Sequence, residues 1–219
     1  DDGEYTATLT ISDLAGNDMT EDYLFNIAAD PVEPPEFSLQ AFTSNNRIVI
    51  EGEGVISTTI TVFLNEESIG EIELTEATAF SFEHTAAELP ERSEVFLTAT
   101  NPAGVASDPT DIQILFSDVT PPSFSELTPG IGERIEAGSI EEVLIQVVDE
   151  LAGVDVDQLS MTVAGEDIQI EISEIDNGYQ LVGDVSGIDF GEDDNAVEVV
   201  VTAHDNSIPS NQRVVNWEF

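Results

Sequence analysis

The sequence contains no cysteine and no lysine, and each absence excludes chemistry. Of the 219 residues, 46 are Asp or Glu and four are basic, so the formal net charge is −42. Without cysteine the chain cannot form disulfides, zinc–thiolate sites or iron–sulfur clusters, or use a cysteine nucleophile. Without lysine it cannot form a lysine Schiff base or a P-loop. Four scattered arginines cannot form a cationic surface, so we expect no nucleic-acid partner.

Long apolar runs are also missing. No stretch approaches the ~18 apolar residues that a membrane-spanning helix needs, so we expect no membrane insertion in this segment. Hydrophobic residues make up 41% of the chain, which is enough to form buried cores despite the high charge. The sequence shows neither an initiator methionine nor a signal-peptide pattern, and we interpret it as a segment of a longer or processed protein. Its localisation is therefore not indicated by a leader.

An internal repeat organises the chain. A strand-like run, a turn of small residues and a second strand-like run occur in three places, at residues 5–27, 94–116 and 196–219. Gly16 and Gly104 lie 88 positions apart, and the diprolines that follow them, at 34–35 and 121–122, lie 87 apart. Two features recur at nearly one period, which indicates a tandem array with a unit of about 90 residues.

The diprolines predict where the units meet. Proline fixes φ and lacks an amide donor, so a proline pair cannot lie within a central strand but can stiffen a junction. We therefore expect a C-terminal hairpin of an incomplete domain at residues 1–30, one complete domain at residues 33–117 and another at residues 119–219.

Short alternating runs predict seven strands in each complete domain. In RIVIE and AFSFE the apolar side chains recur at every second position, as in a half-buried strand. The strands expected in the first domain are residues 37–41, 47–51, 59–64, 70–74, 80–84, 94–100 and 112–116. Those expected in the second are residues 124–127, 143–148, 159–163, 168–172, 179–182, 197–202 and 214–219. No segment has helical periodicity, so we predict an all-β chain of tandem immunoglobulin-like β-sandwiches joined by short diproline linkers.

Three segments resemble bacterial immunoglobulin-like repeats of large surface adhesins and other extracellular multidomain proteins. DGEYTATLTISDLAGN is similar to the last two strands of such a domain, VTPPSFSELTPGIGERI to the opening of the next, and VVDELAGVDVDQLSMTVAGEDI to the middle strands and their loop. Asp149, Gly153 and Asp155 match the family's aspartate-rich loop, whereas the preceding domain has EGEGV at residues 51–55. The resemblance implies a fold and an extracellular or cell-surface setting. It does not fix one role, because such domains act as spacers, adhesive tips and accessory modules.

Calcium is the main chemical question, because oxygen ligands are what the chain has in excess. In an immunoglobulin-like sandwich the incoming linker, the loop after the second strand and the last hairpin loop share one end. In the second complete domain these segments supply the candidate metal ligands Asp118, Asp149, Glu150, Asp155, Asp157, Asp205 and Asn206. The arrangement resembles junctions at which calcium bridges neighbouring domains.

Two alternatives stay open for these carboxylates. With so many acidic residues some must cluster without binding an ion, and bulk salt could offset the charge instead of calcium. The opposite end of the preceding domain could add Glu88 and Glu91, with Glu66 or Glu67, and a second junction could form around residues 13, 30, 33, 51 and 53.

Catalysis is not indicated. The chain has two histidines and no GxSxG, HExxH or P-loop pattern. Paired carboxylates cannot be excluded by counting, but a general acid needs an apolar pocket, and thin sandwiches offer no deep cleft. We expect His204 to be solvated or capping, and Trp217 to lie in the core rather than on a sugar-binding face.

The sequence therefore predicts a non-enzymatic extracellular spacer, part of an adhesin stalk or fibre, stiffened by calcium, by salt or by both. The alternative is a ligand-binding module, adhesive or carbohydrate-recognising, at one loop end of a sandwich. Its partners would be neighbouring domains, copies of the same protein or a surface receptor. The N-terminal hairpin needs further strands to cover its apolar face. An upstream part of the chain or a neighbouring subunit could supply them, and the completeness of the last domain at Phe219 favours upstream strands.

Overall fold

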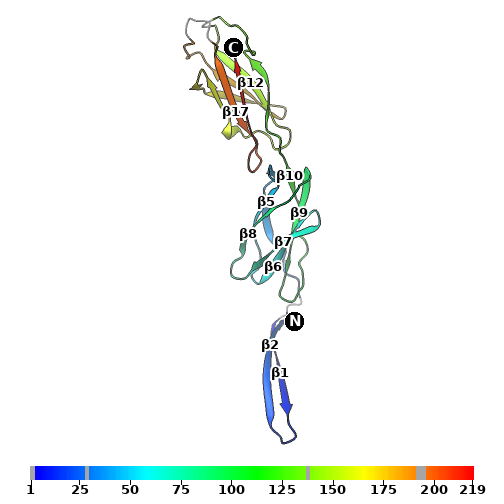
Figure 1. Ribbon diagram of the computed structural model, residues 1–219. Coiled ribbons are helices and arrows are strands. Elements are labelled where there is room, and N and C mark those ends of the chain that lie inside the picture. The colour runs from blue at the N-terminus through cyan, green and yellow to red at the C-terminus, as the bar shows by residue number, and fades with distance from the viewer. Residues whose placement is uncertain (1–2, 28–29, 137–138, 191–195) are drawn as a thin grey trace. The chain divides into compact units, whose positions relative to one another are not determined.

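The computed structural model describes residues 3–27, 30–136, 139–190 and 196–219 (Figure 1). Its contacts divide the chain into two compact units. Unit 1 comprises Asp1–Gln40 and Arg47–Leu115, and unit 2 comprises Ala41–Asn46 and Phe116–Phe219. The short segment Ala41–Asn46 thus belongs to unit 2, although the chain on either side of it belongs to unit 1. The boundaries expected at residues 30–33 and 117–119 remain predictions.

Unit 1 begins with a two-stranded antiparallel hairpin formed by β1 (Gly3–Ser12) and β2 (Asp18–Ile27). The register runs without a bulge from Gly3↔Ile27 to Ser12↔Asp18. Successive side chains of a strand point to opposite faces, so this register separates an apolar face from a polar one. The apolar residues of the first face are Tyr5, Ala7, Leu9, Ile11, Met19, Tyr23, Phe25 and Ile27.

Two sheets enclose the core in the rest of unit 1, and the second of them also includes β4 and the last two residues of β10, which the division above assigns to unit 2. The first has the order β3-β5-β8, with β3 (Glu36–Leu39), β5 (Arg47–Glu53) and β8 (Ala79–Thr85). The second has the order β4-β10-β9-β6-β7, with β4 (Phe42–Thr43), β10 (Gln113–Ser117), β9 (Arg92–Thr100), β6 (Thr58–Leu64) and β7 (Glu67–Leu74). Alternate residues of β5, β6 and β9 face inward and are completely buried, namely Ile48, Ile50, Ile60, Val62, Val95, Leu97 and Ala99. This alternation confirms the two-residue period predicted from RIVIE.

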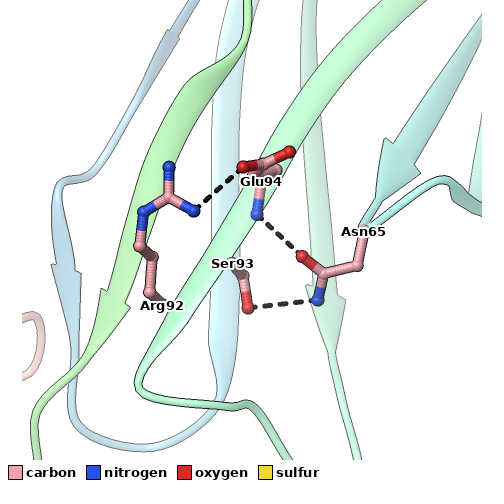
Figure 2. A network of polar contacts seen from close by, with 4 residues as sticks. All are labelled: Asn65, Arg92, Ser93 and Glu94. Atoms are coloured by element: carbon pink, nitrogen blue, oxygen red, sulfur yellow. Dashed lines mark hydrogen bonds and ion pairs between the residues drawn. The ribbon is translucent and has the colours of Figure 1, made fainter.

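A two-residue turn joins β6 to β7 and is fastened to the start of β9. Asn65 and Glu66 both have positive φ, as a type I′ hairpin turn requires. Figure 2 shows the Asn65 side chain accepting a 2.8 Å hydrogen bond from the Glu94 backbone N–H and donating to Ser93 Oγ at 3.4 Å. Arg92 forms an ion pair with Glu94 at 2.9 Å. Asparagine fits this turn because it tolerates the left-handed region and its amide reaches the neighbouring strand.

Unit 2 contains two four-stranded sheets. One has the order β11-β12-β16-β15, with β11 (Ser123–Thr128), β12 (Glu142–Val148), β16 (Gly178–Asp184) and β15 (Ile170–Ile175). The other has the order β14-β13-β17-β18, with β14 (Glu166–Asp167), β13 (Ser160–Val163), β17 (Glu198–His204) and β18 (Gln212–Glu218). A 3₁₀ turn, η1 (Val156–Gln158), precedes β13.

The core of unit 2 follows the same alternation. Val143, Ile145 and Val147 of β12 and Val199 and Val201 of β17 have no exposed surface. Trp217 of β18 is 4% exposed, and its Nε1–H donates a 2.9 Å hydrogen bond to the Pro129 carbonyl oxygen. Trp217 is therefore a core residue, as predicted.

The fold class predicted from the sequence is confirmed. The strand orders are those of two immunoglobulin-like sandwiches, and each diproline lies in the connection immediately before a first strand, β3 or β11. Two strand predictions need correction. The run expected at residues 168–172 is replaced by β15, which starts two residues later at Ile170, and the two-residue strands β4 and β14 were not predicted. A two-residue strand gives too little alternation to be recognised.

Candidate metal centre

Three buried aspartates meet in unit 2, each directly after a core strand. Asp118 follows β10, Asp149 follows β12 and Asp205 follows β17. Their exposed fractions are 2%, 7% and 1%, and one carboxylate oxygen of each lies within 4.8 Å of the other two. Among the described residues, this is the one group of three or more acidic, histidine or cysteine side chains close enough to hold a metal ion. We call these three residues the aspartate triad.

Asp118 joins the chain entering unit 2 to the loop after β12. Its Oδ1 accepts a 2.9 Å hydrogen bond from the Thr120 backbone N–H, and its Oδ2 accepts one of 3.0 Å from that of Ala152. Its own N–H donates to the Thr43 carbonyl oxygen of β4 at 2.8 Å. The carboxylate is thus positioned by two backbone donors from separate segments.

Asp149 organises its own loop. Its Oδ1 accepts backbone hydrogen bonds from Leu151 at 3.2 Å and Gly153 at 2.9 Å. Gly153 has a φ of +74°, a conformation that few residues other than glycine adopt readily. Burial raises the pKa of Asp149, and the neighbouring charges of Asp118 and Asp205 raise it further, against the lowering effect of the two backbone donors.

Asp205 is held by the β17–β18 loop. Its Oδ1 accepts from the backbone N–H groups of Ser207 at 3.1 Å and Asn211 at 2.8 Å. Its Oδ2 accepts from the Ser207 hydroxyl at 3.2 Å and the Asn211 side-chain amide at 2.6 Å. The same amide nitrogen donates to the Asp118 carbonyl oxygen at 2.9 Å. Asn211 therefore connects two members of the triad.

The triad brings together negative charge without a cationic side chain. Two ion pairs of the described residues join Arg47 to Glu83 and Arg92 to Glu94, and neither pair includes a member of the triad. Buried like charges repel strongly, and burial of a charge is costly unless it is paired or bound to a metal. A set of ligands made only of oxygen suits calcium, magnesium or manganese rather than a metal that prefers nitrogen or sulfur. The residues thus fit a hard divalent cation or a shared proton.

The other predicted ligands lie around the triad but outside it. Asp155 caps the η1 turn, where its carboxylate accepts from the Asp157 backbone N–H at 3.1 Å and the Gln158 amide at 2.5 Å. Asp157 and Glu150 are exposed. Asn206 donates from its side chain to the Ala152 carbonyl oxygen at 3.0 Å. Whether any of these four residues binds an ion remains a prediction.

A groove open to solvent reaches the triad at Asp149, the one member of the triad in its lining. Glu150, Glu174, Tyr179 and Asn206 also line it. Carboxylates at this entrance would attract a cation and hold its remaining water ligands. Glu88 and Glu91, expected to face the triad from the preceding domain, belong to unit 1, and their approach to the triad stays a prediction.

Sequence reasoning missed the two supports of this centre. Asn211 could have been suspected only from its place at the end of the last hairpin loop. The segment Ala41–Asn46 gave no signal, yet Phe42 accepts a 3.2 Å backbone hydrogen bond from Ile208, and the Ser44 hydroxyl donates to the Pro209 carbonyl oxygen at 2.6 Å. This segment therefore braces the loop that carries Asp205.

Comparisons with known proteins return structural likeness only. No family model and no curated protein matches the chain. Among solved structures, the fibronectin(III)-like modules of Clostridium thermocellum CbhA match with 13% identity and a TM-score of 0.47, covering 83% of this chain and 92% of that one. The human OSCAR ligand-binding domain matches with 13% identity and a TM-score of 0.41, covering 85% and 99%. Cadherin domains 1–4 of protocadherin gamma B7 match with 15% identity and a TM-score of 0.32, covering 100% and 57%. The fold assignment rests on the strand orders.

In the described part of the chain, no helix is long and apolar enough to cross a membrane.

Proposed function

We propose that this chain is a non-enzymatic structural module of an extracellular protein, and that unit 2 binds one calcium ion through Asp118, Asp149 and Asp205. The observation that carries the proposal is the burial of these three carboxylates, from three separate segments, within 4.8 Å of one another. Side chains so placed need a counter-charge or a proton at neutral pH. A calcium ion supplies the charge and accepts oxygen ligands from all three segments.

Calcium fits the centre better than magnesium. Calcium accepts six to eight oxygen ligands in flexible geometry, whereas magnesium requires a near-ideal octahedron and dehydrates reluctantly. Each aspartate of the triad supplies one oxygen, and Asp149 also lines a partly open groove, so carbonyl groups and water would complete the shell. Extracellular modules bind calcium in the range of about 10⁻⁴ to 10⁻³ M, which is consistent with a centre of this kind outside the cell.

Calcium would act by joining three loops. Asp118 lies where the chain enters unit 2, and Asp149 and Asp205 lie in loops that close one end of the sandwich. The Asp118 and Asp205 loops are also hydrogen-bonded to Ala41–Asn46, whose neighbours in the sequence are β3 and β5 of unit 1. An ion bound to both Asp118 and Asp205 would therefore restrict the motion of the segments that connect the two units along the chain.

The spacer role follows from the tandem sandwiches. Strands of seven to nine residues, as in β5, β6 and β9, span on the order of 23–30 Å at ~3.3 Å per residue, so each unit adds length of that order. A net charge of −42 keeps such arrays soluble and disfavours pairing of their edges. A loop end fixed by calcium would limit bending and resist pulling.

Calorimetric unfolding at fixed ionic strength tests the proposal. Millimolar calcium should raise the unfolding midpoint of unit 2 relative to EDTA, because binding only the folded state stabilises it by mass action. Asp149→Asn should abolish the rise. Asp167→Asn removes the same charge from the exposed strand β14 of the same unit and should keep it. An unchanged midpoint in the wild-type protein, or an equal rise with magnesium at the same concentration, would contradict the calcium assignment.

A further inference from the structure

The turn between β15 and β16 carries an asparagine followed by a glycine, and the local structure favours both residues. Asn177 has a φ of +59°, a left-handed conformation that asparagine adopts more readily than most residues. Gly178 begins β16, and a Cβ atom on it would lie 2.0 Å from the Val147 carbonyl oxygen of β12. Glycine is the residue that allows another backbone to approach so closely. The Asn–Gly pair therefore follows from the shape of this turn and from its contact with β12.

The same pair of residues is chemically reactive. The backbone nitrogen of Gly178 can attack Cγ of the Asn177 side chain, because glycine has no side chain to crowd that nitrogen. The new N–Cγ bond closes a five-membered succinimide ring, and ammonia leaves with the side-chain nitrogen and the proton of the backbone N–H. Water then opens the ring at one of its two carbonyl carbons, which gives aspartate or isoaspartate. The reaction thus needs no co-reactant other than water.

This end of the β15–β16 hairpin is weakly held. Asp176 and Asn177 are exposed, and so are residues 171–174 of β15. In the described sheet β15 is an edge strand that pairs only with β16. Gly178 faces Ile175 in the closing pair of the hairpin, so the attack requires that this pair opens. Segments with few buried contacts and exposed backbone hydrogen bonds open locally at low free energy, without unfolding of the domain.

Asn177 also supports the aspartate triad. Its carbonyl oxygen accepts a 3.0 Å hydrogen bond from the backbone N–H of Asp149, and both residues line the same open groove. We propose that Asn177 is a site of spontaneous deamidation, and that its isoaspartyl product loosens the loop that carries Asp149. The modification site depends on the turn alone, whereas its effect on calcium binding rests on the function proposed above.

Isoaspartate changes the backbone at the point where this loop is held. The chain then runs through Cβ and Cγ of residue 177 to the Gly178 nitrogen, which adds one carbon and ~1.5 Å to its path. The former Asn177 carbonyl becomes a free carboxylate outside the main chain. Gly178 cannot shift to absorb the added length, because the Val147 backbone lies against it. Residue 177 moves instead, so the Asp149 N–H loses its acceptor and a new negative charge enters the groove beside the triad.

Incubation of the full chain in EDTA at mildly alkaline pH, followed by peptide mass spectrometry, tests the modification. The peptide that contains Asn177 should gain about 1 Da, and electron-transfer fragmentation should identify isoaspartate in it. Asn65 is an internal control, because it also lies in a two-residue turn with a left-handed φ, +49°, but is followed by Glu66. It should stay unmodified over the same time. An unmodified Asn177 in the folded chain, or equal reaction at Asn65, would overturn the proposal.

Comparison of the separated isoaspartyl and unmodified chains tests the effect on the loop. In EDTA the isoaspartyl chain should have a calorimetric unfolding midpoint for unit 2 that is lower by several degrees, because a backbone donor has lost its acceptor. Titration calorimetry should show calcium binding weakened at least ~10-fold. Asn177→Asp adds the same charge with a normal backbone and should stay within ~3-fold of wild type.

Two outcomes would overturn this effect. Equal midpoints in the two chains would show that the loop does not depend on the Asn177 carbonyl, and an equal loss of affinity in Asn177→Asp would show that charge alone acts. An unmodified chain that binds no calcium would contradict the function proposed above. The mass increase and the midpoints in EDTA would then still decide whether Asn177 is modified and whether the modification loosens the loop.

Discussion

The backbone N–H of Ala152 donates a 3.0 Å hydrogen bond to Oδ2 of Asp118, although the two residues lie 34 positions apart. Because Asp118 also accepts from Thr120, Asp118→Ala leaves two backbone donors without their acceptor. The two lost acceptors cost roughly 2–4 kcal/mol, which relief of the repulsion with Asp149 and Asp205 offsets in part, so in EDTA we expect Asp118→Ala to have a lower free energy of unfolding than Asp149→Asn. Chemical denaturation measures this loss. Asp167→Ala, at an exposed position of β14, is the comparison, and an equal loss there would contradict the role of Asp118.

Asp149→Asn should have opposite effects with and without calcium. The asparagine oxygen can still accept from Leu151 and Gly153, while the charge that faces Asp118 and Asp205 is removed. Relief of that repulsion should stabilise the metal-free protein by about 1–3 kcal/mol near neutral pH. The same change removes a calcium ligand, so calcium should no longer raise the unfolding midpoint. A variant that is less stable than wild type in EDTA would show that the triad is not under electrostatic strain.

The raised pKa of Asp149 predicts a pH dependence in EDTA. A carboxyl group whose pKa is higher in the folded state holds more protons there, between its ordinary and its raised pKa. This group's contribution to the free energy of unfolding therefore decreases as pH rises through that window. Lowering the pH from neutral into the window increases the contribution again. The difference between wild type and Asp149→Asn isolates this effect, because the other carboxylates are common to both. With calcium the dependence should reverse, since protons then compete with the ion. A constant difference across the window would contradict the prediction.

Asn211→Ala should weaken the centre from outside the set of carboxylates. The substitution removes the amide that donates to Asp205 Oδ2 and to the Asp118 carbonyl oxygen. We expect a loss of about 1–3 kcal/mol in unfolding free energy and weaker calcium binding by titration calorimetry, because Asp205 is no longer held in place. Asn216→Ala removes a long, exposed contact to Glu198 of 3.5 Å and should change neither quantity. Unaltered calcium affinity in Asn211→Ala would exclude a positioning role.

Monovalent salt should stabilise the chain even without calcium. The net charge of −42 includes only four basic residues, so internal pairing can neutralise little of it. Raising potassium chloride from ~0.01 to ~1 M shortens the screening length from about 30 to 3 Å. The unfolding midpoint in EDTA should rise by several degrees. A flat or falling midpoint would show that self-repulsion contributes little to stability.

More of the fold than of the candidate metal centre could be predicted from the sequence, and the reason is physical. Alternating apolar residues determine which face of a strand is buried, and this pattern places Ile48, Ile50 and Trp217 without knowledge of any loop. The order of strands then assigned Asp118, Asp149 and Asp205 to one end. The direction of each side chain within a loop depends on turns such as η1, in which Asp155 caps its own turn. No periodic pattern records such a turn.

The contact between Ala41–Asn46 and the β17–β18 loop was even harder to predict from the sequence. Its partners, Ile208 and Pro209, are more than 160 positions away, and the segment offers backbone carbonyls rather than a recognisable motif. Backbone acceptors are present at every residue, so composition cannot distinguish the ones that are used.

The burial of Trp217 makes the two units optically distinct. It is the single tryptophan of the chain and belongs to unit 2, where only 4% of its surface is exposed. Emission excited at the red edge of indole absorption therefore arises from unit 2 alone and shifts when water reaches the ring, whereas circular dichroism reports the strands of both units. Comparing the two signals during one denaturation would assign each transition to a unit without cutting the chain or adding a label.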